Sequence, residues 1–182
     1  MKSKAAIGNH PIHPMLVPIP IGAFFIAFVG DLLHAATPND PFWYDLSFTC
    51  LGIGLIFGVF AAVFGAIDYL AVPMSSRAFR LATWHAVLNA LAFVSFAATF
   101  IVRRRGGASQ GPAWSWAFGL LLVGFALLAG AGWLGGKVAF EHRVGVVEEP
   151  PAPPARTAVS AVPGPREVAG KPVASRRRQG AN

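Results

Sequence analysis

Charged residues are scarce in this sequence. They make up 13% of its 182 residues, whereas they are about a quarter of an ordinary soluble domain. The apolar share is correspondingly high, at 54%. This balance argues against a soluble enzyme, and the abundance of aliphatic and aromatic residues excludes disorder for most of the length. Because the apolar residues fall into four blocks, we predict an all-α membrane protein that crosses the bilayer several times.

Several motifs that carry chemistry are absent. The one cysteine, Cys50, lies in an apolar run, and no CxxC or CxxCH occurs, which excludes covalently attached c-type heme and thiol redox pairs. There is no Walker-type glycine loop and no GxGxxG after a strand pattern. The net charge of +7 does not indicate a nucleic-acid partner, because the cations lie in loops and tails, where they orient helices and contact anionic lipid. No enzymatic activity is indicated.

The apolar blocks predict a four-helix transmembrane bundle over residues 15–142. Pro73 ends the second span, Ser75 or Ser76 is placed to cap the third, and arginines at 103 to 105 end that span. A short segment, residues 1–14, precedes the bundle. Residues 143–182 are basic and proline-rich and are predicted to be a disordered tail, which is either solvated or bound to anionic lipid. No internal repeat is evident. The four spans are about 15–36, 44–72, 76–102 and 113–136.

The distribution of cations near the span ends predicts the orientation in the membrane. One side of the membrane carries six of them, and the other carries only the three arginines at 103 to 105. Because cytoplasmic loops are enriched in Lys and Arg, we expect both termini in the cytoplasm. The six are Lys2, Lys4, Arg77, Arg80, Lys137 and Arg143.

Small residues form stripes on the second and fourth spans. On the second span they recur at steps of four, three and four, and on the fourth two glycines have GxxxG spacing. Such stripes let a neighbouring backbone approach closely. We predict packing within the bundle, and a dimer face is the alternative. The residues are Gly54, Gly58, Ala61 and Gly65 on the second span, and Gly132 and Gly136 on the fourth.

Four histidines and a carboxylate are expected at one face of the membrane: His10, His13, His85, His142 and Asp68. All four histidines are candidate ligands of a divalent metal, since neutral imidazole binds zinc, copper and iron. For a heme b we prefer His85 and then His13, with His142 next, and Asp68 could orient a ligand histidine. Helix-packing hydrogen bonds are the alternative role for these side chains.

A second polar pair lies toward the other end of the first span. Asp31 and His34 are three residues apart and share one helix face. We interpret them as a polar pair at the membrane interface, with an ionisable site as the alternative.

The opening His10-Pro11-x-His13-Pro14-Met15-Leu16-Val17-Pro18-Ile19-Pro20-Ile21-Gly22 is distinctive. Together with Asp31, Gly65-x-x-Asp68, His85-x-x-x-Asn89, Gly132-Trp133-Leu134-Gly135-Gly136, and Phe140 and His142, it resembles a bacterial membrane family catalogued as domain of unknown function 2231. The similarity covers about residues 7 to 147. It implies a multi-pass inner-membrane protein and supplies no catalytic residue. Relatives that accompany electron-transfer modules make a redox role worth weighing.

Three classes of function remain open at this point. The first is a structural or assembly component of a membrane complex. The second is a redox or metal-binding module that holds heme b or a divalent metal. The third is a small proton-coupled transporter that uses Asp31 and Asp68. The expected partner is the lipid bilayer, followed by membrane electron-transfer proteins or a second copy of the chain.

Overall fold

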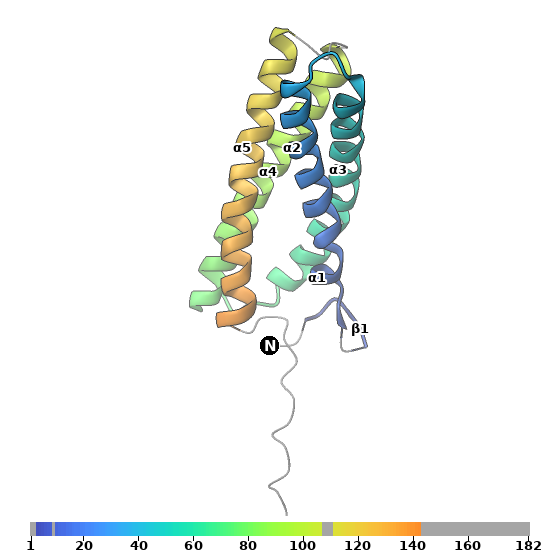
Figure 1. Cartoon of the computed structure of the whole chain (residues 1–182). Coiled ribbons are helices and arrows are strands. Elements are labelled where there is room, and N and C mark those ends of the chain that lie inside the picture. Colours follow the sequence, from blue (N-terminus) through green and yellow to red (C-terminus); the bar gives the residue numbers. More distant parts are fainter. Residues whose placement is uncertain (1–2, 9, 107–110, 143–182) are drawn as a thin grey trace, which may run out of the picture. The chain divides into compact units, whose positions relative to one another are not determined.

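Four long apolar helices make up the computed structural model, which describes residues 3–8, 10–106 and 111–142. All four are long and apolar enough to cross a membrane, and Figure 1 shows them as one bundle. The chain runs through β1 (Ala6–Ile7), β2 (His10–Pro11), α1 (Ile12–Leu16), α2 (Pro18–Ala36), α3 (Pro41–Tyr69), α4 (Arg77–Gly106), α5 (Pro112–Gly136) and the π-helix η1 (Lys137–Glu141). The predicted four-helix transmembrane fold is confirmed.

Prolines and short polar side chains set the helix starts. α2, α3 and α5 each begin with a proline, which has no N–H to lose at a first turn. The Asp40 side chain caps α3 by accepting from the Phe42 N–H at 3.0 Å. The Ser76 hydroxyl accepts from the Phe79 N–H at 3.0 Å, so Ser76 is the residue that caps α4, one of the two predicted from the sequence.

The helix bounds differ from the predicted spans at several ends. α3 begins and ends three residues earlier than predicted, at Pro41 and Tyr69. α4 does not stop before the three arginines but continues through them to Gly106. The first span already becomes helical at Ile12, in α1. The predicted disordered tail and Arg143 lie outside the described residues.

The helices pack mainly as two antiparallel hairpins. α2 contacts α3 along its length, and α5 does the same with α4, whereas contacts between the pairs are fewer. We name them the first hairpin (α1 to α3) and the second hairpin (α4 and α5); they stand side by side in Figure 1. Since each hairpin is antiparallel, α2 and α4 run in the same direction.

The two hairpins repeat one another, although no repeat was evident from the sequence. His13 and Phe24 of the first hairpin have counterparts exactly 72 residues later, at His85 and Phe96. Each phenylalanine ring lies against a glycine of the partner helix: a Cβ on Gly54 would meet Phe24 at 2.5 Å, and one on Gly124 would meet Phe96 at 2.7 Å.

The histidines follow the same pattern. A Cβ on Gly65 would meet the His13 ring at 2.8 Å, and one on Gly135 would meet the His85 ring at 2.7 Å. The second-hairpin glycines follow their counterparts by 70 residues. The chain is therefore built from two equivalent units with parallel orientation, an arrangement also found in transporters with repeats about an axis along the membrane normal.

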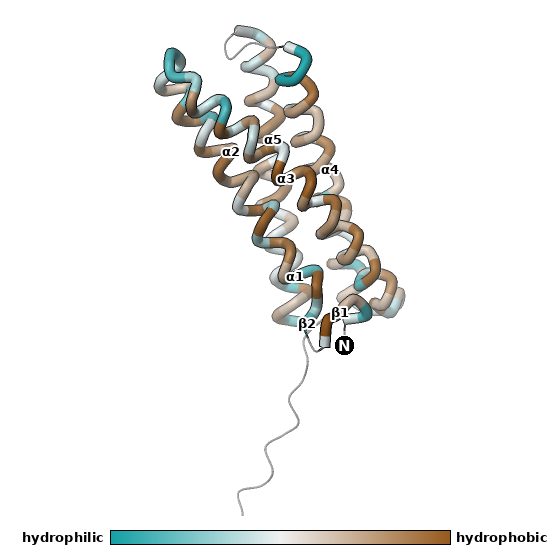
Figure 2. The backbone as a smooth tube through the Cα atoms, turned by 90° about the vertical axis from the view of Figure 1, so that its right-hand side faces the viewer, coloured by the Kyte–Doolittle hydropathy of each residue, from teal (hydrophilic) through white to brown (hydrophobic). Residues whose placement is uncertain are grey.

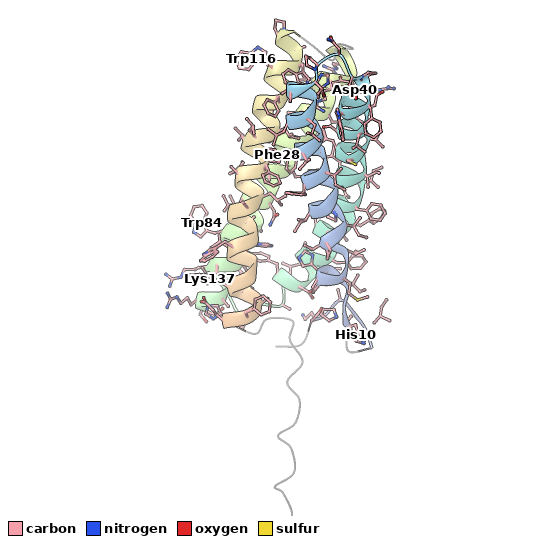
Figure 3. The ribbon with its side chains drawn as sticks, viewed as in Figure 1. His10, Phe28, Asp40, Trp84, Trp116 and Lys137 are labelled. Carbon is pink, nitrogen blue, oxygen red and sulfur yellow. The ribbon has the colours of Figure 1, made fainter. Side chains whose placement is uncertain are left out.

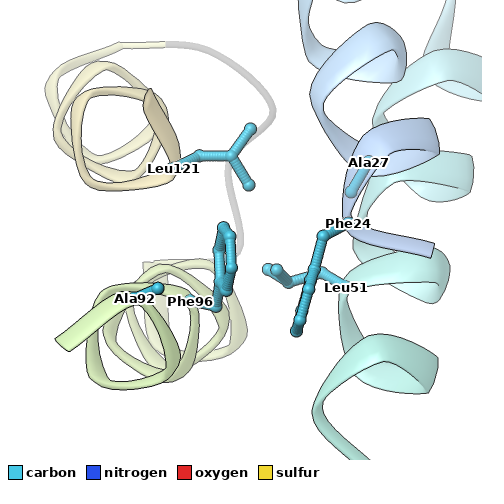
Figure 4. Close-up of a cluster of buried hydrophobic side chains, with 6 residues drawn as sticks. All are labelled: Phe24, Ala27, Leu51, Ala92, Phe96 and Leu121. Atoms are coloured by element: carbon cyan, nitrogen blue, oxygen red, sulfur yellow. The ribbon is translucent and has the colours of Figure 1, made fainter. Parts of the chain in front are cut away.

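The apolar core lies where the two hairpins meet. Phe24 and Phe96 stack with ring centroids 3.9 Å apart, and the fully buried Leu51 and Leu121 pack around them (Figure 4). Apolar residues dominate the middle of the helices and polar residues are more frequent toward their ends, as the colouring in Figure 2 shows. Trp84 and Trp116 point away from the bundle in Figure 3, as residues of an aromatic belt would.

Substitution by alanine should affect stability differently at glycines that contact rings and at glycines that do not. Gly124→Ala should destabilise the bundle because its methyl group would enter the Phe96 ring. Gly119 has no heavy atom within 4 Å of an added Cβ, so Gly119→Ala on the same helix should be neutral or slightly stabilising through higher helix propensity. Thermal unfolding in detergent measures both. Equal losses of stability in the two variants would show that packing of rings against glycines does not stabilise the hairpins.

Candidate functional site

Polar residues gather at both ends of the interface between the hairpins. We call them the histidine end, around His13 and His85, and the ion-pair end, around Asp31 and Arg103. The two ends are separated by the Phe24–Phe96 stack. Eighteen residues of helix separate the ends, which corresponds to about 27 Å at 1.5 Å per residue.

At the histidine end, two imidazoles make the same hydrogen bond in the two hairpins. His13 Nδ1 lies 2.8 Å from the Ala61 carbonyl oxygen, and His85 Nδ1 lies 2.7 Å from the Ala131 carbonyl oxygen. A carbonyl can only accept, so each Nδ1 carries the proton and donates it. In a neutral imidazole the lone pair then belongs to Nε2. Both rings are half-buried.

Asn89 makes the two imidazoles unequal. Its amide nitrogen donates to the His85 carbonyl oxygen at 2.9 Å. The same nitrogen lies 3.1 Å from Nε2 and 3.4 Å from Nδ1 of the His85 ring, so it lies over the face of the imidazole and not in line with the Nε2 lone pair. The residue at the equivalent position of the first hairpin is Val17, which has no side-chain donor. Within the described residues, His13 Nε2 has no hydrogen-bond partner.

The other candidate ligands lie apart from this pair. His10 is exposed on β2, and His142 follows η1, where its backbone N–H donates to the Lys137 carbonyl oxygen at 3.3 Å. Among the described residues no group of three or more His, Cys, Asp or Glu side chains could hold a metal ion. The structure therefore places His13 and His85 at equivalent positions of the two hairpins, and it does not assemble the four-histidine site among the described residues.

Asp68 binds the N-terminal segment rather than a histidine. Its Oδ1 accepts from the Ser3 hydroxyl at 2.7 Å and from the backbone N–H groups of Lys4 and Ala5 at 3.1 and 3.3 Å. The Ala5 carbonyl oxygen in turn accepts from the Ile12 N–H at 2.9 Å, directly before His13. In place of the expected hydrogen bond from Asp68 to a ligand histidine, the structure shows a chain of contacts that holds the segment leading to His13.

The small-residue stripe of α3 lies against rings of neighbouring helices. Besides the glycines that meet Phe24 and His13, a Cβ on Gly58 would meet the Phe93 ring of the second hairpin at 2.9 Å. Ala61 is buried and supplies the carbonyl oxygen for His13. By contrast, an added Cβ on Gly132 or Gly136 meets nothing within 4 Å. A dimer face formed by these two glycines stays a prediction.

At the ion-pair end, Arg103 and Asp31 form a buried salt bridge between the hairpins. The second guanidinium nitrogen, Nη1, donates to the Ser47 hydroxyl at 3.0 Å, and the guanidinium carbon lies 5.5 Å from the centre of the Tyr44 ring. Asp31, Ser47 and Arg103 are at most 4% exposed. Asp31 is therefore buried inside the bundle, and its depth in the membrane stays a prediction. Arg103, which the sequence placed after the end of the third span, belongs to α4 instead.

His34 is buried beside this salt bridge. It is 1% exposed and lies between two aromatic rings, with centroid distances of 5.6 Å to Tyr44 and 5.4 Å to Trp114. Sequence reasoning did not group the buried Asp31, His34 and Arg103 because Arg103 stands in a run of three arginines. One signal was present: Arg103 follows Asp31 by 72 residues, the same interval that separates the paired histidines.

Removing one partner of the buried salt bridge should be costly. Arg103→Met leaves Asp31 uncompensated, which we expect to lower the free energy of unfolding by about 3–5 kcal/mol. The double variant Asp31→Leu/Arg103→Met should recover most of the loss, because an apolar pair of similar size leaves no buried charge. Arg104→Met, at an exposed position, is the matched control. Denaturation in detergent checks all three, and additive losses in the double variant would contradict the pairing.

The comparison with known proteins agrees with these motifs. No curated protein and no solved structure matches the chain. Residues 9–148 match a family described as "Predicted membrane protein (DUF2231)". The match includes both hairpins and both polar ends, and it confirms the resemblance seen in the sequence. The chain belongs to the DUF2231 family of predicted membrane proteins.

Proposed function

We propose that this protein is a redox or metal-binding module of the bacterial inner membrane, with a transition-metal centre held between His13 and His85. One observation carries the proposal: the two imidazoles occupy equivalent positions of the two hairpins, and each donates its Nδ1 proton to a backbone carbonyl. Histidines that bind metals almost always donate the other ring N–H to a carbonyl, carboxylate or water, which fixes the tautomer and directs Nε2 at the metal.

The number of available ligands favours heme iron over a bare ion. A structural zinc ion takes four protein ligands and a catalytic one takes three, whereas the described residues contain no group of three candidate ligands. Heme iron needs only axial ligands from the protein, because the porphyrin supplies the other four nitrogens. Two imidazoles from two different hairpins meet that need, so we assign heme b as the cofactor.

The basic residues near this end suit such a cofactor. Arg80 lies five residues before His85 on α4, about 7.5 Å along the helix, and Arg77 lies one turn further. Lys137 begins η1, directly after the segment that contacts the His85 ring. Positive side chains at this depth could pair with the two carboxylates of a heme, while the apolar ring stays between the hairpins.

A purely structural or assembly role is the second candidate. It is favoured by the fact that each histidine hydrogen bond joins the two helices of one hairpin, which a clamp would also do. A proton-coupled transporter has less support. Transporters of this kind bind substrate near the midplane, and here the stacked rings of Phe24 and Phe96 fill the middle of the interface.

We further propose that the histidine end faces the cytoplasm, with both termini on that side. The supporting argument is the cation asymmetry, which is larger than the sequence alone suggested. Arg103 is neutralised inside the bundle by Asp31, so only Arg104 and Arg105 remain as exposed cations at the ion-pair end of the described chain. The positive-inside rule then favours the histidine end as cytoplasmic.

Purification after heme-replete expression tests the cofactor. We expect a reduced-minus-oxidised difference spectrum typical of a heme with two histidine ligands, and about one heme per chain by hemochrome assay. His13→Ala and His85→Ala should lower the heme content several-fold, whereas His10→Ala, at an exposed position, should not. Folded protein that contains neither heme nor a transition metal would leave the histidines as structural residues.

Cysteine labelling in intact cells tests the orientation. Asn39 and Ser75 are exposed in the loops at opposite ends of the bundle, so each can carry a single cysteine in a Cys50→Ala background. A membrane-impermeant maleimide should label Asn39→Cys and spare Ser75→Cys until the cells are lysed. The reverse pattern would overturn the proposed orientation.

A further inference from the structure

An exposed face of the second hairpin combines cations with tryptophans at the histidine end. On α4, Arg77, Arg80 and Trp84 follow one another at steps of three and four residues, which places them on one side of the helix. All three are exposed. At the end of α5, Trp133 is 71% exposed, and the Lys137 ammonium nitrogen lies 5.9 Å from the centre of the Trp133 ring. We name these five residues the basic–aromatic face.

The five residues belong to one surface because α4 and α5 pack against each other as antiparallel helices. The His85 ring lies against Gly135, so Trp84 and Trp133 stand within about one helical turn of the same height. Figure 3 shows Trp84 and Lys137 on the same side of the bundle, away from the first hairpin. The three cations lie beyond the tryptophans, toward the ends of the helices.

The cations of this face have no protein partner for their charge. The one salt bridge among the described residues joins Arg103 to Asp31 at the opposite end of the bundle. Within the same part of the chain, neither the two arginines of the face nor Lys137 forms an ion pair or a side-chain hydrogen bond, and Glu141 of η1 does not pair with them. An anion from outside the chain can therefore pair with all three cations.

Beyond Trp84, the same side of α4 becomes apolar. Val87, Leu91 and Val94 continue the steps of three and four residues toward the middle of the span, and all three are exposed. Cations, a tryptophan and aliphatic side chains thus succeed one another along the helix. This order matches the phosphate, the glycerol group and the acyl chains of a phospholipid, because tryptophan is enriched at the level of the headgroups.

The first hairpin lacks this arrangement, although it repeats the helices of the second. Counted back by the intervals of the repeat, the two tryptophans and Lys137 correspond to Ile12, Val63 and Ile67. An aromatic belt that only places the bundle in the bilayer is expected around both hairpins. The basic–aromatic face is therefore an addition to the second hairpin that the fold itself does not require.

We propose that the basic–aromatic face binds an anionic phospholipid with two phosphate groups, of the cardiolipin type. Basic pockets between membrane helices suit such headgroups, and three unpaired cations exceed the single charge of a phosphatidylglycerol. The cations hold the phosphates, the tryptophans lie beside the glycerol groups, and the acyl chains cover the aliphatic residues that follow on α4. The face lies on the outside of the bundle, so it is open to lipid whether or not a heme lies between the hairpins.

Helix α4 offers a matched pair of double variants for the test. Arg77→Gln/Arg80→Gln removes two cations of the face, and Arg104→Gln/Arg105→Gln removes two exposed cations at the other end of the same helix. Full-length protein in detergent is titrated with cardiolipin at fixed ionic strength, and bound lipid is counted by native mass spectrometry. Each cation near the surface is worth about a fivefold change in affinity. We expect the first variant to bind about 25-fold more weakly than the wild type and the second to bind like the wild type.

Two results would overturn the inference. The wild type should bind cardiolipin more tightly than phosphatidylglycerol at equal phosphate concentration, and equal affinities would reduce the face to an ordinary aromatic belt. Equal losses in the two double variants would reveal attraction between charges without a site. Size-exclusion profiles identify variants that fail to fold, and Lys137→Gln, which we expect to bind about fivefold more weakly, then carries the comparison.

Heme content measured in the same samples separates this inference from the proposed function. Specific binding of cardiolipin by protein that contains no heme would support the inference and count against the heme centre. A variant of the two arginines that loses lipid and keeps heme would support both. A variant that loses heme and keeps lipid would overturn the inference, because the arginines would then serve the carboxylates of the cofactor.

Discussion

Inside a bilayer, helices gain little from burying apolar surface, because the lipid tails are as apolar as the side chains; attraction must come from close packing and hydrogen bonds. This chain meets that constraint with one repeated contact, an aromatic or imidazole ring placed against a glycine of the neighbouring helix. Two such contacts in each hairpin set the spacing of the helices. They also orient the imidazoles, because a ring pressed against Gly65 or Gly135 lies within reach of the carbonyl oxygen one turn earlier.

The same constraint explains why polar residues within the spans are few and why several of them bond across helices. Every unpaired polar group in lipid is costly, so a histidine or an arginine inside a span needs partners from a neighbouring helix. The duplicated architecture supplies these partners in pairs: the histidines meet carbonyl oxygens within their own hairpins, whereas Arg103 finds Asp31 across the interface. Two chemically different ends are thereby kept apart by an apolar centre.

The fold could be predicted from the sequence because spans and their ends depend on local signals. Apolar runs and the capping Ser76 were sufficient for the helix count and some of the bounds, whereas α3 ends at Tyr69, before the stop predicted at Pro73. The site was only partly predictable. His13 and His85 could be assigned to one end of the bundle, but their carbonyl partners depend on how two helices approach, which no single segment encodes. Arg103 was misread because its neighbours Arg104 and Arg105 are true exposed cations. The repeat was missed because few positions remain identical, and these are the residues at contacts.

The salt bridge also affects which hairpins can associate with one another. If the first hairpins of two molecules packed together, their two Asp31 side chains would face one another. If the second hairpins packed together, the two Arg103 side chains would face one another. Neither charge would be compensated in lipid, so both pairings are unfavourable. Only one hairpin of each kind gives a neutral interface. During insertion, when many identical chains share a membrane, this charge difference favours assembly of each chain with itself over exchange of hairpins between molecules.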